Sequence, residues 1–298
     1  MIDLHMHTVA SDGALTTPEL LRACEKLKLE LISITDHYSV GAYQALSDPG
    51  VRALFSGEIL PGCEYSAHFN GCGIEVLGYG IDPETAAAYI ETHYMTLQEK
   101  RKWELEKLIA CYRQRGFLFD EKRVRAAMQL GYDSRRTIFT ELDRYAENIA
   151  KYSNPASHGD HKCFSRSEVF NPNSPYFISE EGIVPSLQEV CAFIHESGGR
   201  SILAHPCSYD ETVQHMLEEM IESAHLDGLE AYYLTFNATQ RQDLLALCRK
   251  YHLICSAGSD FHNDQRSRQY GNVLGMKGFE KVVPIEEITA WVRQLNRI

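Results

Sequence analysis

The sequence predicts an α/β fold, in which helices pack outside a parallel sheet and a helical insertion interrupts the chain. Strand-like apolar segments alternate with helical patterns at both ends of the chain, and this alternation is typical of parallel sheets. From about residue 82 the pattern becomes helical and then polar, and the alternation resumes at Ser186. We therefore expect one catalytic domain built from residues 1–82 and 180–298, with a helical insertion or lid over residues 83–179.

The first part of the chain carries clear start and turn signals. Thr16 and Pro18 are a hydroxyl cap and a first-turn proline for a helix. The run from Asn70 to Gly73 indicates a hairpin between two strands. The expected elements are a strand at 1–8, a helix at 16–29, a buried strand at 30–37, a helix to about 55, and strands at 58–69 and 73–82.

The middle of the chain is predicted to be helical and then irregular. Residues 86–116 form one long helical pattern that ends at Gly116, and two shorter helical segments extend to about residue 150. Residues 151–177 are rich in Asn, Pro and Ser, which is typical of a loop. Beyond them we expect helices at 186–199, 211–225 and 238–252, and strands at 200–206, 226–233 and 253–262.

Composition limits the classes of function. The formal net charge of -12 argues against binding duplex nucleic acid or an anionic membrane, although bound cations would reverse the local field. No apolar run approaches the ~20 residues of a membrane span, and the N-terminal residues lack a signal-peptide pattern. We therefore expect a cytoplasmic protein. Its nine cysteines are predicted to be reduced, because their number is odd and the chain is too large to need disulfides.

Histidines and acidic residues recur where predicted strands end. The carboxyl ends of strands are where α/β barrels and open parallel sheets build their sites. Each residue alone has an ordinary structural explanation, but their recurrence at one end of successive strands indicates a common site. The candidates are His5, His7 and Asp12 after the first strand, His37 after the second, Glu64 in the third, His205 in LAHP, and Asp260 with His262 in GSDFH.

The residue types indicate a metal centre. Imidazole together with carboxylate suits Zn, Mn or Fe, and mixed sites of this kind can hold two or three ions. His5 and His7 are two residues apart, so on a strand they point to one face, and Asp260 and His262 have the same spacing.

These residues together resemble the PHP (polymerase and histidinol phosphatase) family of metal-dependent phosphoesterases. The resemblance lies in DLHMHTVASDG, ISITDHYSVGAY, ILPGCEYSA, EVLGYGID, GGRSILAHP and AGSDFH. It implies a distorted seven-stranded, TIM-like β/α barrel that holds two or three divalent ions, Mn, Fe or Zn. The eight candidates above fall on its ligand positions. Glu75 stands where the family commonly has histidine; we keep it as a ligand and note His68 as a replacement that could compensate.

The resemblance also implies a chemistry. A hydroxide bridging the metals would attack phosphorus, and no protein nucleophile is needed, which agrees with the absence of a GxSxG or Walker motif in this sequence. Asp36 is expected to orient a ligand from outside the metal centre. Expected substrate phosphate contacts are Arg135, Arg136, Arg166 and His158, with His161 and Tyr176 as weaker candidates.

Several substrates remain open at this stage. The first is a nucleoside 3',5'-bisphosphate or a short oligonucleotide end, and the alternative is a cyclic or monoester sugar phosphate, such as a ribose 1,2-cyclic phosphate. Histidinol phosphate ranks lower. A non-catalytic metal-binding module and an amide-cleaving metallohydrolase are the readings from other classes. No oligomeric state is predicted.

Overall fold

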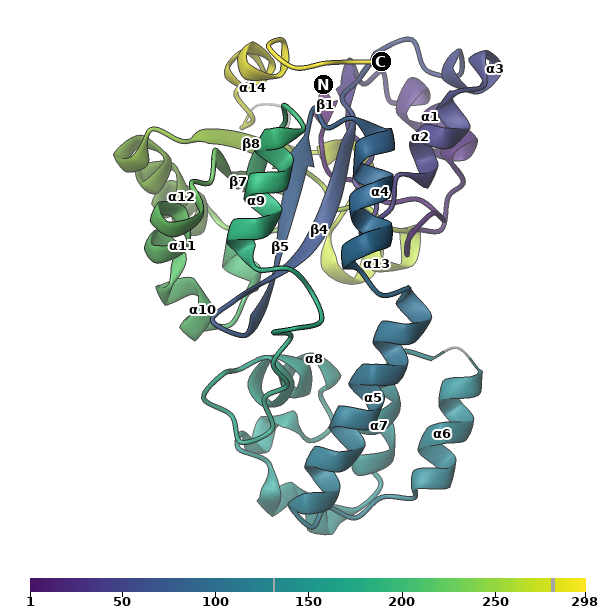
Figure 1. Ribbon diagram of the computed structural model, residues 1–298, viewed down its shortest axis with the longest axis vertical. Helices are drawn as coiled ribbons and strands as arrows, with labels where there is room; N and C mark the ends of the chain where they lie inside the picture. The colour runs from purple at the N-terminus through teal and green to yellow at the C-terminus, as the bar shows by residue number, and fades with distance from the viewer. Residues whose placement is uncertain (131, 280–281) are drawn as a thin grey trace.

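Eight strands form two sheets in the computed structural model, which describes residues 1–130, 132–279 and 282–298 (Figure 1). The first sheet has the order β1-β2-β3 and the second has the order β4-β5-β6-β7-β8. The strands are β1 (Ile2–Asp3), β2 (Leu31–Ile32), β3 (Glu58–Ile59), β4 (Gly62–Phe69), β5 (Cys72–Tyr79), β6 (Arg200–Leu203), β7 (Gly228–Tyr233) and β8 (Ile254–Gly258).

The strand directions differ in part from the expectation. The first sheet is parallel, and so are β6, β7 and β8, but β5 runs antiparallel to both β4 and β6. The hairpin expected at Asn70–Gly73 is therefore present as β4 and β5, and it inserts an antiparallel pair among otherwise parallel strands. A seven-stranded barrel is not confirmed, since the described strands form sheets of three and five and neither closes on itself.

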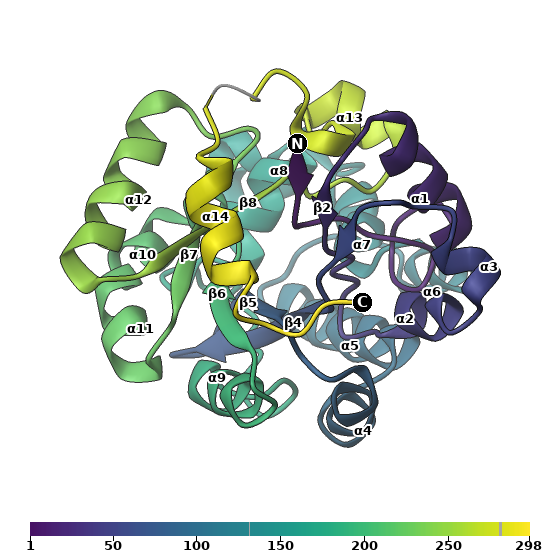
Figure 2. The same cartoon turned by 90° about the horizontal axis from the view of Figure 1, so that it is seen from above.

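Backbone hydrogen bonds connect the two sheets along both edges. On one side, the amide of Leu4 donates to the carbonyl of Ala257 at 3.0 Å, and that of His7 donates to Phe261 at 2.9 Å. On the other, the amide of Tyr38 donates to the carbonyl of Glu64 at 2.8 Å. The strands consequently surround one interior, with helices outside them (Figure 2).

Among the described residues, ten α-helices accompany the strands. Most lie around them, and α14 lies across the end opposite α5 (Leu97–Gln114), α6 (Glu121–Gln129), α7 (Ser134–Leu142) and α8 (His161–Phe164) (Figures 1 and 2). The ten helices are α1 (Thr17–Lys26), α2 (Gly41–Leu46), α3 (Pro49–Arg52), α4 (Pro83–His93), α9 (Leu187–Glu196), α10 (Glu211–His215), α11 (Leu217–Ala224), α12 (Ala238–Tyr251), α13 (Asp264–Tyr270) and α14 (Ile285–Val292).

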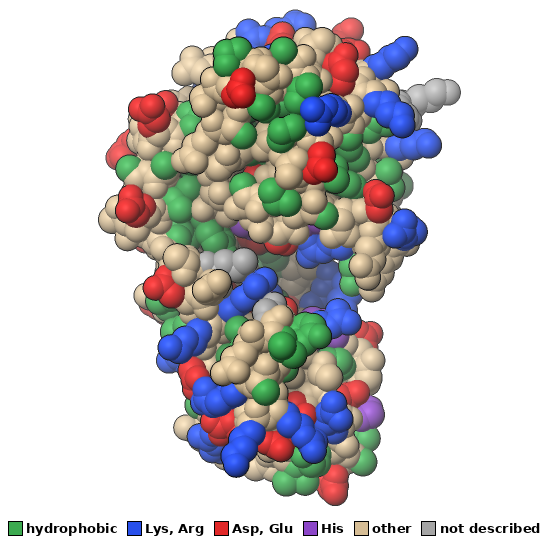
Figure 3. Space-filling model, turned by 90° about the vertical axis from the view of Figure 1, so that its right-hand side faces the viewer, with side chains coloured by type: hydrophobic (Ala, Val, Ile, Leu, Met, Phe, Trp, Pro, Cys, Tyr) green, Lys and Arg blue, Asp and Glu red, His purple; other side chains and the backbone are tan. Residues whose placement is uncertain are grey.

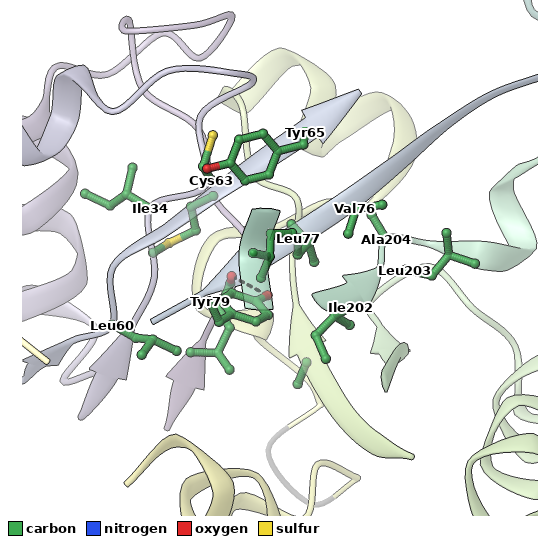
Figure 4. Packing of buried hydrophobic residues seen from close by; sticks show 14 of the residues in the cluster. Ile34, Leu60, Cys63, Tyr65, Val76, Leu77, Tyr79, Ile202, Leu203 and Ala204 are labelled. Carbon is green, nitrogen blue, oxygen red and sulfur yellow. Dashed lines mark hydrogen bonds between the residues drawn. The ribbon is translucent and has the colours of Figure 1, made fainter. Parts of the chain in front are cut away.

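The interior between the sheets is apolar and tightly filled. Figure 4 shows Tyr79 among Leu77 on β5, Ile202 on β6 and Leu60, which directly follows β3. The Tyr79 hydroxyl donates to the carbonyl of Leu4 at 2.8 Å, so the one polar atom of this buried ring is paired. Full burial of a large apolar side chain contributes about 1.5–3 kcal/mol, and this core therefore fixes the strands that carry the candidate residues.

The β4–β5 hairpin and the following helix refine two expectations. The hairpin turn is Asn70–Gly71, with φ values of 50° and 77°, as a two-residue turn of this kind requires. The single long helix expected at 86–116 is instead two helices, α4 and α5 (Leu97–Gln114). Thr96 and Glu99 form a capping box that starts α5, while Tyr94 is extended and ends α4.

Helices α5–α8 build a second, smaller core. Leu108, Tyr112, Ile138 and Phe164 are fully buried in it, whereas α4 packs on the main core through Ala86. The other helices here are α6 (Glu121–Gln129), α7 (Ser134–Leu142) and α8 (His161–Phe164), with 3-10 turns at Ala146–Lys151 and Pro155–Ser157 and a π turn at Ser165–Val169. The loop expected at 151–177 thus contains short helical segments, since Asp160 caps α8.

Two expectations from composition can be compared with the described residues. All nine cysteines lie within them, and each is a free thiol. No helix among these residues is long and apolar enough to cross a membrane.

Asp3 links the two ends of the chain inside the core. Its carboxylate accepts hydrogen bonds from the amide and hydroxyl of Ser259 at 3.0 and 2.6 Å, and from the amide of Gly275 at 2.8 Å. Burial raises the pKa of Asp3 to about 6, and these hydrogen bonds oppose the shift. The first strand is therefore held directly against the segment that follows the last one.

Replacing Asp3 tests this link. Asp3→Ala leaves several buried donors without an acceptor, and each such group costs about 1–3 kcal/mol. We expect the free energy of unfolding of the metal-free protein to fall by about 2–4 kcal/mol in urea. Asp243→Ala, an exposed aspartate on α12, should change it by less than about 0.5 kcal/mol. Equal stability of the two variants would contradict the role given to Asp3.

Candidate metal centre

The structure brings all nine candidate ligands together at the end of the strands that faces α5–α8. Figure 3 shows a hollow between the two parts of the molecule, with His, Asp and Glu side chains at its upper wall. Eight of the candidates fall into three donor groups whose nitrogen and oxygen atoms lie within 4.8 Å of one another. The first group is His5, His7, Glu64 and Asp260, the second is His7, Asp12, His37 and His262, and the third is His37, Glu64 and Glu75.

The first donor group is the most deeply buried. His7 Nε2 lies 3.1 Å from Asp260 Oδ1 and 3.3 Å from Glu64 Oε2. His5 Nε2 lies 3.2 Å from the same Glu64 oxygen. His5 and His7, the two histidines of the HMH sequence, therefore both direct Nε2 at the carboxylates of Glu64 and Asp260.

The second donor group lies nearer the surface. Asp12 Oδ1 lies 3.1 Å from His262 Nε2 and 3.8 Å from His37 Nε2. The rings of His7 and His262 stack with centroids 4.1 Å apart. Residues from the first and last strands thus meet in one group.

The third donor group contains the residue that departs from the PHP pattern. His37 Nδ1 lies 3.2 Å from Glu64 Oε2 and 3.6 Å from Glu75 Oε1. His205 lies beside the same two acids, with its Nε2 3.1 Å from Glu64 Oε1 and 3.2 Å from Glu75 Oε2. Glu75 therefore faces the centre.

His7, His37 and Glu64 are each shared between two donor groups. A neutral imidazole has one nitrogen free to bind a cation, so His7 and His37 can each serve one group only. The shorter contacts of His7 are made by Nε2 in the first group, and those of His37 by Nδ1, which lies 3.2 Å from Glu64 in the third group. Glu64 has two oxygens, one facing His5 and His7 and the other facing His205. It can therefore connect the first and third groups.

Unusual backbone conformations place these side chains. Asp260 has a φ of 53° and His205 a φ of 28°, which non-glycine residues rarely adopt. Strain of this kind persists only where the surroundings impose it, and it gathers at functional sites. Glu75 is held by its backbone, since its amide donates to the Tyr209 hydroxyl at 2.9 Å and its carbonyl accepts from Ala204 at 3.0 Å.

Glu230 is a functional residue that the sequence reasoning missed. It is fully buried on β7, with its Oε1 2.9 Å from His5 Nδ1, while its Oε2 accepts from the amide of His205 at 2.8 Å. A carboxylate only accepts, so His5 donates from Nδ1 and its Nε2 is left facing the donor group. The available signal was one acidic residue inside the apolar run LDGLEAYY.

Asp36 forms hydrogen bonds with the loop between His7 and Asp12 and does not orient a ligand side chain directly. Its carboxylate accepts from the amide and hydroxyl of Thr8 at 2.7 Å each, and from the hydroxyl of Ser11 at 2.6 Å. The segment between His7 and Asp12 is thereby fixed. Asp36 thus acts on Asp12 through the backbone.

The charges of the metal-free centre are strongly coupled. Burial alone would lower the pKa of His5, but Glu230 and Glu64 raise it well above its usual value. The pKa of His205 is raised in the same way by Glu64 and Glu75. Burial would raise the pKa of Glu64, yet the neighbouring histidines His5 and His37 hold it well below its usual range. Without a metal, these shifts favour protonated His5 and His205 beside an ionised Glu64.

The donor atoms are arranged to bind a cation, and not to form hydrogen bonds with one another. The buried atoms His5 Nε2, His7 Nε2, Glu64 Oε2 and His262 Nε2 have no hydrogen-bond partner, although each lies close to the others. Buried polar atoms are normally paired, so a converging set without partners is the arrangement expected of a site that could hold a cation. Imidazole and carboxylate are also the donors that Zn, Mn and Fe accept.

The expected phosphate contacts are scattered among α7, α8 and their loops. Arg135 pairs with Glu104 at 3.5 Å and Asp133 at 3.6 Å, and His158 lies 3.4 Å from Asp143. The remaining candidates differ in exposure. Arg136 and Arg166 are exposed, His161 begins α8, Tyr176 is buried in the second core, and His68 lies on β4 outside the three donor groups.

Three other cations contact Asp12 or residues of segments that follow a candidate ligand. Arg266 on α13 donates to Asp12 Oδ2 at 3.3 Å. Lys100 on α5 lies over the ring of Tyr38 and pairs with Glu180 at 3.2 Å. Lys162 on α8 lies over the ring of Tyr270 on α13. Lys and Arg side chains accordingly gather around the hollow in Figure 3, and sequence reasoning had no signal for these three.

An α/β scaffold with imidazole and carboxylate donors at one end of its strands is characteristic of metal-dependent hydrolases. A model of the PHP domain matches residues 3–275, and the chain therefore belongs to the PHP domain family.

Curated relatives carry three different names. The chain is 26% identical to the 5'-3' exoribonuclease Rnm of Salmonella typhimurium, over 87% of this chain and 84% of that protein. It is 26% identical to a phosphoribosyl 1,2-cyclic phosphate 1,2-diphosphodiesterase of Eggerthella lenta, over 87% and 93%. It is 25% identical to a 3',5'-nucleoside bisphosphate phosphatase of Chromobacterium violaceum, over 88% and 87%. All three names describe hydrolysis of phosphate esters.

Solved structures share the fold. An amidohydrolase from Chromobacterium violaceum superposes with a TM-score of 0.60 at 24% identity, covering 88% of this chain and 87% of that one. A protein from Bifidobacterium adolescentis assigned as a metal-dependent phosphoesterase superposes with a TM-score of 0.56 at 22% identity, covering 90% and 94%.

Glu230 offers a test of the centre that leaves every candidate ligand in place. Glu230→Gln removes the charge that orients His5, and loss of such a partner lowers metal affinity about 10–100-fold. We expect this loss in calorimetric titration of metal-free protein with Mn²⁺. Glu219→Gln, an exposed glutamate on α11, should bind as the unaltered protein does. Full affinity in Glu230→Gln would show that His5 needs no such partner.

The pH dependence of metal binding follows from the raised pKa values of His5 and His205. Metals bind neutral imidazole, so binding must displace the protons that these rings retain near neutral pH. We expect Mn²⁺ binding to release protons, with affinity rising and release falling as pH increases through the raised pKa values.

Calorimetry in buffers of different ionisation enthalpy measures this release. His205→Gln should reduce it, while His195→Gln, a remote histidine paired with Asp227, should not. Release that is absent near pH 7 would mean that the rings are already neutral.

Proposed function

We propose that the protein is a metal-dependent phosphoesterase whose divalent ions, two or three of Mn, Fe or Zn, are held by the three donor groups. The observation that carries the proposal is the convergence of unpartnered buried nitrogen and oxygen atoms from opposite ends of the chain. The proposed ligands are His5, His7, Asp12, His37, Glu64, Glu75, His205, Asp260 and His262.

Bound divalent ions would supply the charge that activates water near neutral pH and neutralises the phosphoryl oxygens. The chain's own residues have other tasks. Glu230 fixes the tautomer of His5, and Asp36 fixes the loop before Asp12. Glu64 faces both the first and the third donor group and so fixes the distance between them. Phosphoryl transfer depends mostly on positioning and charge neutralisation, so this division of labour suits the reaction.

Cations around the hollow would bind the rest of the substrate. Arg166 is exposed and is close enough to Lys162 to affect its pKa, and Lys162 lies over the ring of Tyr270 on α13. Arg136 is also exposed and is close enough to His161 to affect its pKa. Arginine binds phosphate oxygens in a bidentate manner, and we assign Arg166 and Arg136 to a second phosphate.

The substrate favoured by this arrangement is a nucleoside 3',5'-bisphosphate or a short oligonucleotide end. Such a molecule has one phosphate for the donor groups and another for Arg136 on α7 and Arg166 in the π turn that follows α8. The names of the Salmonella and Chromobacterium relatives support this class. A cyclic sugar phosphate is the second candidate, which the Eggerthella relative supports.

The same proposal gives the two parts of the chain separate roles. We infer that the two sheets act as one distorted barrel wall around the donor groups, supported by the hydrogen bonds of Leu4 and Tyr38. Residues 83–179 would act as a lid that contributes cations. The contact of Lys162 with Tyr270 supports this, because it joins α8 to the helix that follows His262.

A panel of phosphate esters tests the proposal. Protein loaded with Mn²⁺ would be assayed with adenosine 3',5'-bisphosphate, a short 5'-phosphorylated RNA and a ribose 1,2-cyclic phosphate. Products would be separated by chromatography, so that release of nucleotide and release of phosphate are both seen. We expect turnover of the first two, and turnover of the cyclic ester alone would favour the second candidate.

Arg166→Ala distinguishes a substrate contact from a structural role. We expect its KM for the bisphosphate to rise about tenfold, as loss of a charged hydrogen bond predicts, with metal content unchanged. Arg144→Ala, which removes an exposed arginine bound to Glu141, is the control. Metal binding without turnover of any ester, or with turnover of an amide panel instead, would overturn the proposed function.

A further inference from the structure

Tyr233 is a buried tyrosine of β7 whose hydroxyl contacts a proposed metal ligand. The hydroxyl donates to Asp260 Oδ2 at 2.8 Å, and the ring lies edge-on to the imidazole of His205, with centroids 5.6 Å apart. The other oxygen of Asp260, Oδ1, lies 3.1 Å from His7 Nε2 and 3.5 Å from His5 Nε2. The two oxygens of this carboxylate therefore face different partners, one the tyrosine and the other the first donor group.

Asn272 determines the direction in which the Tyr233 hydroxyl points. The buried Nδ2 of Asn272 donates to the hydroxyl oxygen of Tyr233 at 3.0 Å and to the carbonyl of Ser259 at 2.8 Å. The amide nitrogen only donates and an ionised carboxylate only accepts. The hydroxyl must therefore accept from Asn272 and donate its single proton to Asp260. Each member of this chain of hydrogen bonds has its orientation fixed by the next.

A β-bulge brings Tyr233 to the side of β7 that Glu230 occupies. Side chains alternate along a regular strand, so residues three positions apart would face opposite sides. The register of β7 against β8 shifts between Glu230 and Tyr232, where β7 has one extra residue. Bulges of this kind redirect side chains and are common beside functional sites. Glu230 and Tyr233 consequently both contact His205, the first through its backbone amide and the second through its ring.

We propose that Tyr233 is a positioning residue of the metal centre, whose hydroxyl, oriented by Asn272, holds Asp260 with Oδ1 directed at the first donor group. The proposal rests on the metal centre of the proposed phosphoesterase and adds a residue that acts through a ligand. Asp260 has a φ of 53°, a conformation that persists only where the surroundings impose it. Its side chain is 18% exposed, so without the hydroxyl the carboxylate would be free to turn away from the donor group.

Tyr233→Phe tests this role, because it removes the hydroxyl and keeps the ring. Residues that orient a metal ligand contribute about 10–100-fold to metal affinity. In calorimetric titration of metal-free protein, we expect at least one Mn²⁺ to bind Tyr233→Phe about tenfold more weakly than it binds the unaltered protein. Tyr232→Phe makes the same change at the neighbouring tyrosine of β7, which lies outside the donor groups, and should bind Mn²⁺ as the unaltered protein does.

The visible spectrum of bound Co²⁺ separates positioning from a general loss of stability. This absorption depends on which donor atoms surround the ion and on how they are arranged. At saturating Co²⁺ we expect the spectrum of Tyr233→Phe to differ from those of the unaltered protein and Tyr232→Phe. A loss of stability alone would lower the melting temperature of the metal-free variant and leave the spectrum of the bound ion unchanged. Circular dichroism would confirm that each variant is folded.

The outcomes decide the proposal without any assay of activity. An unchanged Mn²⁺ affinity or an unchanged Co²⁺ spectrum in Tyr233→Phe would overturn the positioning role. Such a result would leave the phosphoesterase function standing if the unaltered protein hydrolyses esters. Weaker Mn²⁺ binding with an altered Co²⁺ spectrum, together with no turnover of any ester by the unaltered protein, would uphold the positioning role and refute the function.

Discussion

The contact between the two ends of the chain is the constraint on which the centre depends. The Asp3 carboxylate binds the backbone and hydroxyl of Ser259 and the amide of Gly275. This brings the first strand beside the last and sets His5 and His7 within reach of Asp260. A buried carboxylate is costly unless its acceptor positions are filled, and here the donors that fill them come from the other end of the chain. The same contacts therefore close the fold and bring the donor groups together.

The donor groups could be predicted from the sequence, but the supporting interactions could not. His5 and His7 lie two residues apart at the end of a strand, and that spacing is visible without a structure. Glu230 gave a weaker signal, because a single acid in an apolar strand has several explanations. Arg266 gave no signal in the sequence, because its contact is with Asp12, a residue 254 positions away. Pairing between strands distant in sequence is set by packing, and local patterns do not encode it.

The helical middle was harder to predict for a different reason. Its pattern from 86 to 116 is continuous, and the break at Thr96 arises because its capping box and the extended Tyr94 outweigh helix propensity. Charge is unevenly divided between the two parts. Residues 83–179 carry 15 Lys and Arg and 13 Asp and Glu, which leaves 14 and 28 in the remainder. The part with the donor groups therefore has most of the negative charge, whereas the helical part has a small excess of cations.

The sharing of His7 and His37 between donor groups has a consequence for how the centre fills. Each imidazole has one proton and one lone pair, so an ion that takes one nitrogen of His37 fixes the proton on the other nitrogen. That proton then points at the carboxylates of the next group, Glu64 and Glu75, and orients them. Occupancy of one group would therefore change how the donors of its neighbour are oriented, so that binding of ions at neighbouring groups would be linked.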